Sequence, residues 1–350
     1  MDTELVNQDN IVSATVSDDE LYERHRITVD PGQEAMRVDK FLQQRLSGVS
    51  RTKIKLATLN SCVLVNGSPC KASYNVKPLD VISVLLPYPP NVYDIVAEDI
   101  PVNIVYEDDD IIVVDKAAGM VVHPAVGNFT GTLVNALSYH LKDETGADGQ
   151  PLKPYLVHRI DKDTSGLLLI AKNEAAQVML AKQFFDHTTE RKYAALVWGD
   201  FDEDAGTVVG NIARSQKDRR VMAVYDDPEV GKHAVTHWRV VERFGYTTLI
   251  ECVLETGRTH QIRAHMKHIG HPLFADSAYG GDKILKGTTF SKYKQFVDIC
   301  FAAMPRQALH AFILGFEHPT THKRMHFESP LPNDMTTVLE RWRSYVAGRI

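Results

Sequence analysis

The chain has 350 residues, of which 44% are hydrophobic and 24% charged, and its formal net charge is −6. This composition is typical of a soluble globular protein of two or three domains. It contains no run of about 18 apolar residues, which excludes a membrane span, and its acidic N-terminus is not a secretory signal. We therefore expect a cytoplasmic protein with four reduced cysteines.

Charge is unevenly distributed at the N-terminal end. Residues 1–34 carry nine acidic and two basic side chains, whereas residues 35–73 carry seven basic side chains and one acidic. Residues 1–25 show little hydrophobic periodicity, so we predict a flexible acidic tail there. The basic block that follows predicts a local surface for anions, which the net charge of the whole chain conceals.

Short elements are predicted over residues 26–87. A strand at 26–30 precedes an amphipathic helix at 38–46, and Ser50 is a candidate cap for a second helix at 51–60. Strands follow at 62–67, ending in an Asn-Gly turn, and at 77–87. The proline-rich segment 88–94 predicts a linker between two domains.

Residues 34–87 resemble the small α/β RNA-binding module first seen in ribosomal protein S4, and we assign residues 26–87 to this domain. The resemblance lies in MRVDKFLQQRL, VSRTKIK, VLVNG and VKPLDVISV. In that fold the second helix presents basic side chains at its N-terminus, where free N–H groups and the helix dipole already favour phosphate. The resemblance makes Arg51, Lys53 and Lys55 candidate RNA contacts. A solvated basic helix face is the alternative interpretation.

Residues 95–350 have the pattern of a second, larger domain. Strands are predicted at 103–108, 110–116, 167–172, 191–199, 233–245, 246–255 and 309–319, and helices at 131–142, 174–187, 259–269 and 332–346. Long strands with a few packed helices predict an α+β domain, with a mixed, largely antiparallel sheet and flanking helices.

The stretch HRIDKDTSG at 158–166 places charged residues directly before the apolar run LLLIA. Charged groups beside a core are costly unless they are paired or used. One interpretation is a structural turn, in which Asp and Ser side chains bond loop amides. Another is an aspartic-protease loop, which would need a second carboxylate-bearing copy, and the chain has none.

A third interpretation is a metal site that includes the histidine-rich stretch THQIRAHMKHIGHP at 259–272. Its four histidines are separated by 5, 3 and 3 residues, unlike the i, i+4 pair of a zinc-binding helix. Arg258 comes just before them, and Arg263 and Lys267 lie between them. Because cations between the candidate ligands oppose a metal ion, we predict no metal site.

The fourth interpretation is a catalytic carboxylate. Residues 158–172 resemble the active-site motif of the pseudouridine synthases that modify large-subunit ribosomal RNA and some transfer RNAs: His-Arg-Leu-Asp, two residues, Thr-Ser-Gly-Leu-Leu-Leu, then Ala-Lys, with Ile160 as a conservative change. Segments 111–124, 191–199, 255–281 and 309–319 fit that family in the same order. The resemblance covers residues 26–345 and departs at Ala117, where the family usually has proline.

The resemblance implies roles for individual residues. Asp161 is similar to the catalytic aspartate, Arg263 to its arginine partner, and Tyr193 to the tyrosine that stacks on the target uracil. Arg159 is similar to the arginine that helps to extrude that base, and His158 belongs to the same motif. Candidates for lining the RNA cleft are Lys116, Arg191, Lys192, Arg258 and Lys267. Without the motif, Tyr193 would be interpreted as a half-buried strand tyrosine and Arg263 as a phosphate contact.

The activity implied is isomerisation of specific uridines to pseudouridine in large-subunit (23S) ribosomal RNA, by a monomeric enzyme. Isomerisation exchanges no electrons or phosphate, and the chain lacks a GxxxxGK[ST] loop, so we expect no cofactor. Two alternatives stay open: the same chemistry on transfer RNA, and a noncatalytic RNA-binding or ribosome-assembly factor. A glycoside or nucleoside hydrolase is disfavoured because it would usually need a second carboxylate as acid or base.

Overall fold

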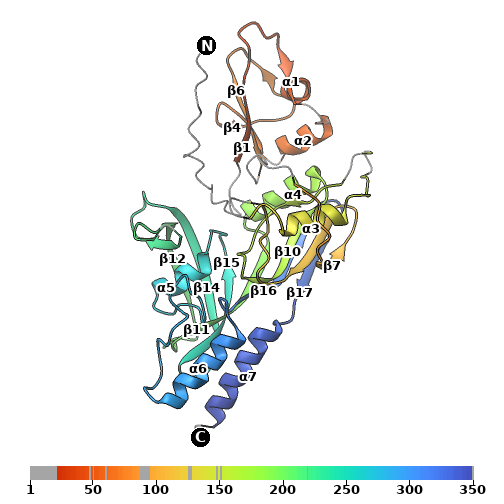
Figure 1. The fold of residues 1–350 in the computed structure, drawn as a ribbon. Coiled ribbons are helices and arrows are strands. Elements are labelled where there is room, and N and C mark those ends of the chain that lie inside the picture. The colour runs from red at the N-terminus through yellow and green to blue at the C-terminus, as the bar shows by residue number, and fades with distance from the viewer. Residues whose placement is uncertain are drawn as a thin grey trace, which may run out of the picture.

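The structure, a computed structural model, describes residues 22–46, 49, 51–59, 61–86, 95–124, 128–146, 149, 152–218 and 220–348. The predicted linker 88–94, residues 1–21 of the predicted tail and the predicted cap Ser50 lie outside the described residues. Figure 1 shows a small N-terminal module beside a larger unit built on one long sheet. Among the described helices, none has both the length and the apolar character that crossing a membrane requires.

The N-terminal module is the predicted small α/β unit. Its elements are β1 (Tyr22–Thr28), β2 (Met36–Arg37), α1 (Val38–Arg45), α2 (Arg51–Leu59), β3 (Val63–Val65), β4 (Ser68–Pro69), β5 (Asn75–Val76) and β6 (Val81–Leu86). The strands form a sheet in the order β1-β6-β3-β4, and β2 pairs with β5. Phe41 and Leu42 of α1 and Ile54 of α2 share a core with the sheet, which explains the apolar spacing of both helices.

Strand β1 begins earlier than the strand predicted at 26–30. It pairs antiparallel with β6, from Tyr22 opposite Leu86 to Thr28 opposite Val81. The prediction that residues 22–25 belong to a flexible tail is therefore wrong. Because β1 lies at the edge of the sheet and most of its described side chains are exposed, its sequence lacks the apolar alternation that indicates a strand.

The larger unit confirms the predicted α+β class. Its elements are β7 (Asn103–Glu107), β8 (Ile111–Lys116), α3 (Leu133–His140), β9 (Tyr155–Leu156), β10 (Ser165–Ala171), α4 (Glu174–Phe185), β11 (Glu190–Trp198), β12 (Ala205–Arg214), β13 (Met222–Tyr225), β14 (Lys232–Arg243), β15 (Thr247–Leu254), α5 (Gln261–His268), α6 (Ser291–Ala303), β16 (Leu309–Glu317), β17 (Arg324–Glu328) and α7 (Asn333–Ala347). Its sheet has the order β13-β12-β14-β15-β11-β16-β10-β8-β7, with β17 beside β16 and β9 beside β10. Of the strand pairs described, β10 with β16 is parallel and the others are antiparallel.

Strand β10 is buried along its whole length. Leu168 and Ile170 pack into the core that includes residues of α3, whereas Leu167 and Leu169 pack into the core that includes residues of α4. Side chains alternate across a strand, so burial of both faces gives an unbroken apolar run. This explains LLLIA, and it fixes the start of β10 in the centre of the molecule.

Helices α6 and α7 lie side by side at the end of the unit away from the N-terminal module (Figure 1). The core at this end contains Trp342 of α7, Tyr293, Val297 and Cys300 of α6, and the β11 residue Trp198. Helix α6 was not among the predicted helices, although Tyr293, Val297 and Cys300 repeat at i, i+4 and i+7. Strands β12, β13 and β17 were not predicted either.

The N-terminal module contacts the larger unit through α4. Helix α2 lies against α4, and Val178 of α4 is buried in the same core cluster as Ile54 of α2. On its opposite side α4 packs against β10. One helix therefore separates the basic module from the strand that follows the charged loop at 158–164 (Figure 1).

Candidate active site

The loop that carries Asp161 is a tight turn before β10. Within it the amide of Thr164 donates to the carbonyl oxygen of Asp161 at 3.1 Å. Gly166 follows with φ +114°, and a Cβ there would lie 2.2 Å from the carbonyl oxygen of Ala311 on the parallel neighbour β16. Only glycine permits this close approach in that conformation, so the Gly of DTSG is a packing requirement.

Two buried cations bind the main chain of this loop. The Lys116 ammonium donates to the carbonyl oxygens of Ala117, Met120 and Lys162 at 2.8–2.9 Å. From another element, Arg306 donates to the carbonyl oxygen of Asp163 at 3.0 Å and is itself held by both carboxylate oxygens of Asp334. The residues that follow Asp161 are thus fixed by side chains distant in sequence.

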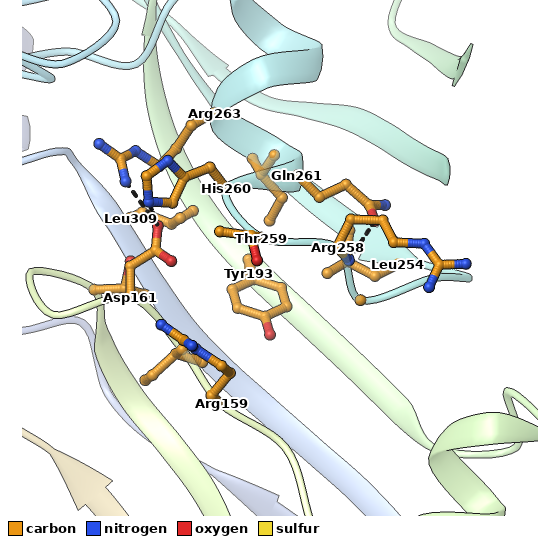
Figure 2. Close-up of a pocket in the computed structure, with 14 residues that line it drawn as sticks. Arg159, Asp161, Tyr193, Leu254, Arg258, Thr259, His260, Gln261, Arg263 and Leu309 are labelled. Carbon is orange, nitrogen blue, oxygen red and sulfur yellow. Dashed lines mark hydrogen bonds and ion pairs between the residues drawn. The ribbon is translucent and has the colours of Figure 1, made fainter. Parts of the chain in front are cut away.

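A pocket opens beside Asp161 (Figure 2). It brings together the predicted residues Arg159, Asp161, Tyr193, Arg258 and Arg263. These residues come from the loop before β10, from β11, from the turn after β15 and from α5. The predicted site is therefore assembled from four separate segments of the chain.

Asp161 and Arg263 form the predicted pair. Nη1 of Arg263 donates to Oδ2 of Asp161 at 2.8 Å, and the Asp161 side chain is 18% exposed. The rest of the guanidinium is occupied by Asp276, whose two oxygens accept from Nε at 2.7 Å and Nη2 at 3.0 Å. This bidentate contact fixes the plane of the guanidinium and hence the direction of its third hydrogen bond.

The surroundings of Asp161 keep it ionised. Burial raises the pKa of its carboxyl, but His260, Arg263 and Arg159 oppose burial and bring the pKa below the ordinary value of an aspartate. The site therefore holds an anion in a largely buried position, which requires a fixed cation beside it.

Tyr193 contributes an aromatic ring to the pocket wall. Along β11, Tyr193, Ala195 and Val197 face one core, and Ala194, Leu196 and Trp198 face the other. The alternation places Tyr193 on the pocket side, where it is 6% exposed. In Figure 2 its ring lies between Asp161 and Arg258, so a planar base that entered the pocket would meet the ring.

Known proteins resemble this chain over most of its length. Residues 110–268 match the family model described as RNA pseudouridylate synthase, and residues 36–82 match the S4 domain model. A relative from Chlorobaculum parvum, described as an uncharacterized RNA pseudouridine synthase, is 47% identical and covers 92% of this chain and 98% of its own. The Zymomonas mobilis protein named ribosomal large subunit pseudouridine synthase D is 41% identical and covers 89% and 95%.

The chain belongs to the RNA pseudouridine synthase family. A solved human structure, RNA pseudouridylate synthase domain containing 4, has the same fold, with a TM-score of 0.52 and 23% identity over 69% of this chain and 93% of its own. The protein is therefore an isomerase with an S4 domain, as the sequence predicted.

Three residues that the sequence placed in the substrate site of this synthase are instead buried in its interior. Lys116 is 1% exposed, with its ammonium on three carbonyl oxygens. His158 accepts a hydrogen bond from the amide of Leu169 at 2.8 Å and stacks on Phe184. Burial, together with Arg191, lowers the pKa of His158 well below its usual range. Arg191 is itself buried, over the ring of Phe184.

The other predicted cleft residues of the synthase lie nearer the surface. Nε of Arg258 donates to the carbonyl oxygen of His233 at 3.0 Å, which directs the arginine along the pocket rim. Lys192 is 3.4 Å from Glu190, and Lys267 is exposed on α5. Of these three, Arg258 is the one that lines the pocket.

Sequence reasoning missed three residues of the synthase's site. Asp276 holds Arg263, while His260 and Tyr279 lie beside Asp161 and Arg263. All three belong to segment 255–281, which was matched as a whole without roles for these positions. His260 was considered only as a metal ligand, yet His265 bonds Thr236 and His271 bonds the Trp198 carbonyl, so these histidines have separate partners.

Lys116→Met is expected to lower the free energy of unfolding by about 2–4 kcal/mol, because three carbonyl oxygens lose their donor. Burial lowers the pKa of Lys116 to about 7, against the opposing effects of Asp161 and Asp163. Between pH 7 and the ordinary pKa of a lysine, the unfolded chain keeps this proton whereas the folded protein releases it. Over that range the free energy of unfolding therefore rises with pH, by up to about 1.4 kcal/mol per pH unit.

Urea unfolding of both proteins at about pH 6 and pH 9 checks this expectation. The difference between wild type and Lys116→Met should be larger at the higher pH. Parallel dependence of the two proteins on pH would show that Lys116 keeps its ordinary pKa.

Proposed function

We propose that this synthase isomerises specific uridines of large-subunit ribosomal RNA, with Asp161 as the group that acts on the nucleoside. The observation that carries the proposal is the geometry of Asp161. Its Oδ2 is held by Arg263 at 2.8 Å, and its other carboxylate oxygen faces the pocket between Tyr193 and Arg159 (Figure 2). A held, ionised carboxylate beside an aromatic wall is what the reaction needs.

The reaction rearranges one nucleoside without a co-reactant. The N1–C1′ bond between uracil and ribose breaks, a C5–C1′ bond forms, C5 loses its proton and N1 gains one. Three roles are open to the carboxylate: attack on the ribose, attack on the base, or removal of a ribose proton. Each of them requires the anion, and the pKa of Asp161 lies below its ordinary value.

Tyr193 and Arg159 suit the handling of an extruded base. A uridine must leave its helix or loop to reach the pocket, at a cost of a few kcal/mol that stacking offsets. Tyr193 offers the ring for stacking, and the exposed Arg159 lies at the other side of the pocket (Figure 2). An enclosed site also keeps the detached uracil in place while it turns.

Two observations favour ribosomal RNA as the target. Relatives from Zymomonas mobilis, Nitrosomonas europaea and Vibrio vulnificus are named ribosomal large subunit pseudouridine synthase D, at 39–41% identity over at least 89% of this chain. The S4 domain, whose helix α2 carries basic residues at its N-terminus, packs beside the catalytic unit. The proposed enzyme is a cytoplasmic monomer without a cofactor, acting on free or assembling large-subunit RNA.

Chemical mapping of pseudouridine in ribosomal and transfer RNA tests the target, with cells that contain or lack this protein. The proposal expects sites that disappear from large-subunit ribosomal RNA alone. Loss confined to transfer RNA would overturn the ribosomal target and leave the chemistry standing. Unchanged maps for both RNAs would overturn the proposal.

The basic helix of the S4 domain yields a separate prediction. Nε of Arg51 donates to Oδ2 of the buried Asp39 at 2.9 Å, so replacing Arg51 would disturb the fold. Lys53→Ala with Lys55→Ala is the cleaner variant. It should weaken RNA binding and reduce the slope of log K against log salt by about 0.7–0.9 for each phosphate that is no longer neutralised. The kcat at saturating RNA should change little.

Lys292→Ala with Lys294→Ala is the matched control. These lysines have the same spacing on α6, are exposed, and lie at the far end of the molecule from the S4 domain (Figure 1). The control should bind RNA like wild type when both are compared by filter binding at several salt concentrations. An equal loss in both double variants would mean that net charge, rather than the helix, determines RNA affinity.

A further inference from the structure

His260 lies beside the catalytic carboxylate in an uncommon backbone conformation. It precedes α5 with φ +54°, in the left-handed region, which histidine adopts more often than most residues other than glycine. Its Nε2 is 3.8 Å from Oδ2 of Asp161, the same oxygen that accepts from Arg263. This conformation sets the direction in which the imidazole leaves the start of α5.

Tyr279 is the hydrogen-bond partner of Nδ1 of His260, and this contact bears on which ring nitrogen carries the proton. The Tyr279 hydroxyl accepts a hydrogen bond from the amide of Met222 at 2.9 Å and is 3.1 Å from Nδ1 of His260. The hydroxyl has one hydrogen, and the amide already occupies one of its lone pairs. Among the described contacts of this hydroxyl, Nδ1 is the partner that can accept its hydrogen, so we assign Nδ1 as the acceptor.

The ring of His260 is consequently an Nε2–H donor directed at Asp161. A neutral imidazole has one N–H, so an accepting Nδ1 leaves the hydrogen on Nε2. Burial lowers the pKa of His260, opposed by Asp161 and Asp276 and assisted by Arg263 and Arg159, which favours the neutral ring. The charged or titratable groups that face it are Asp161, Arg263, Asp276, Arg159 and Tyr279.

We propose that His260 is a positioning residue for Asp161: its Nε2–H, in the tautomer set by Tyr279, acts with Arg263 on Oδ2 and keeps the other oxygen aimed into the pocket. Arg263 alone gives this oxygen a single hydrogen bond, about which the carboxylate can turn. A second donor on the same oxygen restricts that rotation. The 3.8 Å separation shortens to a hydrogen bond when substrate fills the pocket, as happens at many active sites. The inference rests on the proposed role of Asp161.

Tyr279 also connects this arrangement to the strand pair β12–β13. Met222, whose amide binds the hydroxyl, is the first residue of β13. The Tyr279 ring lies under the guanidinium of Arg263, 4.9 Å from its central carbon. One side chain thus touches the hairpin, the histidine and the arginine.

Two substitutions at position 260 separate the proposed donor from the local backbone. The side-chain nitrogen of asparagine occupies roughly the place of Nδ1, and that of glutamine the place of Nε2. His260→Asn tolerates the left-handed backbone but lacks a donor that reaches Asp161. His260→Gln carries the greater backbone strain but keeps such a donor. A purely structural role predicts that asparagine is the better replacement, whereas the positioning role predicts glutamine.

The assay follows tritium released from C5 of uracil, with total RNA labelled at that position and isolated from cells that lack the protein. This substrate contains the target whether it is ribosomal or transfer RNA. We expect His260→Asn to lower kcat by about 10–100-fold with KM nearly unchanged, and to move the acidic limb of the kcat profile to higher pH. His260→Gln should retain most of the wild-type kcat.

Tyr279→Phe supplies a double-mutant cycle. It should lower kcat by about tenfold in wild type and cause no further loss in His260→Asn, because the tautomer no longer matters there. Additive losses, or a His260→Asn variant faster than His260→Gln, would overturn the inference alone. Turnover by Asp161→Asn in the same assay would overturn the proposed role of Asp161 and this inference with it.

Discussion

Asp161→Asn should release no measurable tritium from C5-labelled RNA, a loss of about 10⁴-fold or more. The amide has the shape of the carboxylate, so the turn before β10 and the packing of Gly166 against Ala311 should persist. What disappears is the negative charge that the reaction uses. Thermal unfolding and RNA affinity should stay close to wild type, because Arg263 keeps both hydrogen bonds to Asp276 and the amide oxygen can still accept from Nη1.

Asp163→Asn is the matched control for this experiment. Asp163 belongs to the same turn, but its side chain does not line the pocket, and its carbonyl oxygen still accepts from Arg306 after the change. We expect it to retain most of the activity. If Asp161→Asn and Asp163→Asn turned over at similar rates, the chemistry would have to be assigned to another group.

Arg263→Met should both inactivate and destabilise the enzyme. The guanidinium makes two hydrogen bonds to Asp276 and one to Asp161, so its removal leaves two poorly solvated carboxylates without a cation. Breaking a buried pair in this way costs about 3–5 kcal/mol. Burial, no longer opposed by Arg263, should raise the pKa of Asp161. As the pH is lowered, any residual activity should therefore be lost at a higher pH than in wild type.

The double variant Arg263→Met with Asp276→Asn separates the two effects. Removing the Asp276 charge should restore much of the stability, measured by urea unfolding, because one buried charge is gone. Turnover should stay low, because Asp161 still lacks its partner. Recovery of kcat along with stability would mean that Arg263 serves the fold and not the carboxylate.

Short-range patterns in the sequence were sufficient for much of this protein. The motif at 158–172 located Asp161 before a fully buried strand, because a short apolar run bounded by charged residues is typical of a strand with both faces covered. Apolar spacing predicted α1, since one face of that helix must be buried, and helices were also predicted where α4, α5 and α7 occur. Charge in residues 35–73 predicted a surface for anions, and the resemblance of segments such as MRVDKFLQQRL predicted the S4 domain that the family comparison identified.

Some elements were missed because their local pattern is weak. β1 is an edge strand whose stability comes from its pairing with β6, so its exposed residues carry no alternation. β12 contains two glycines that lie against Trp238 and Val224. These side chains belong to neighbouring strands and leave no room for a Cβ, so the strand's own sequence does not show why glycine is there. In both cases the partner strand, rather than the strand itself, determines the structure.

The site shows the same division between sequence and tertiary structure. By itself the sequence determined that Asp161, Tyr193 and Arg263 belong together, since their motifs follow in a recognisable order. Only the tertiary structure decided that Asp276 and His260 complete the pair formed by Asp161 and Arg263, which lie 102 residues apart. The tertiary structure also showed that Lys116 and His158 are buried and bond the main chain at Lys162 and Leu169. The physical reason is that residue spacing specifies which face of an element a side chain occupies, whereas its partner depends on which distant elements pack there.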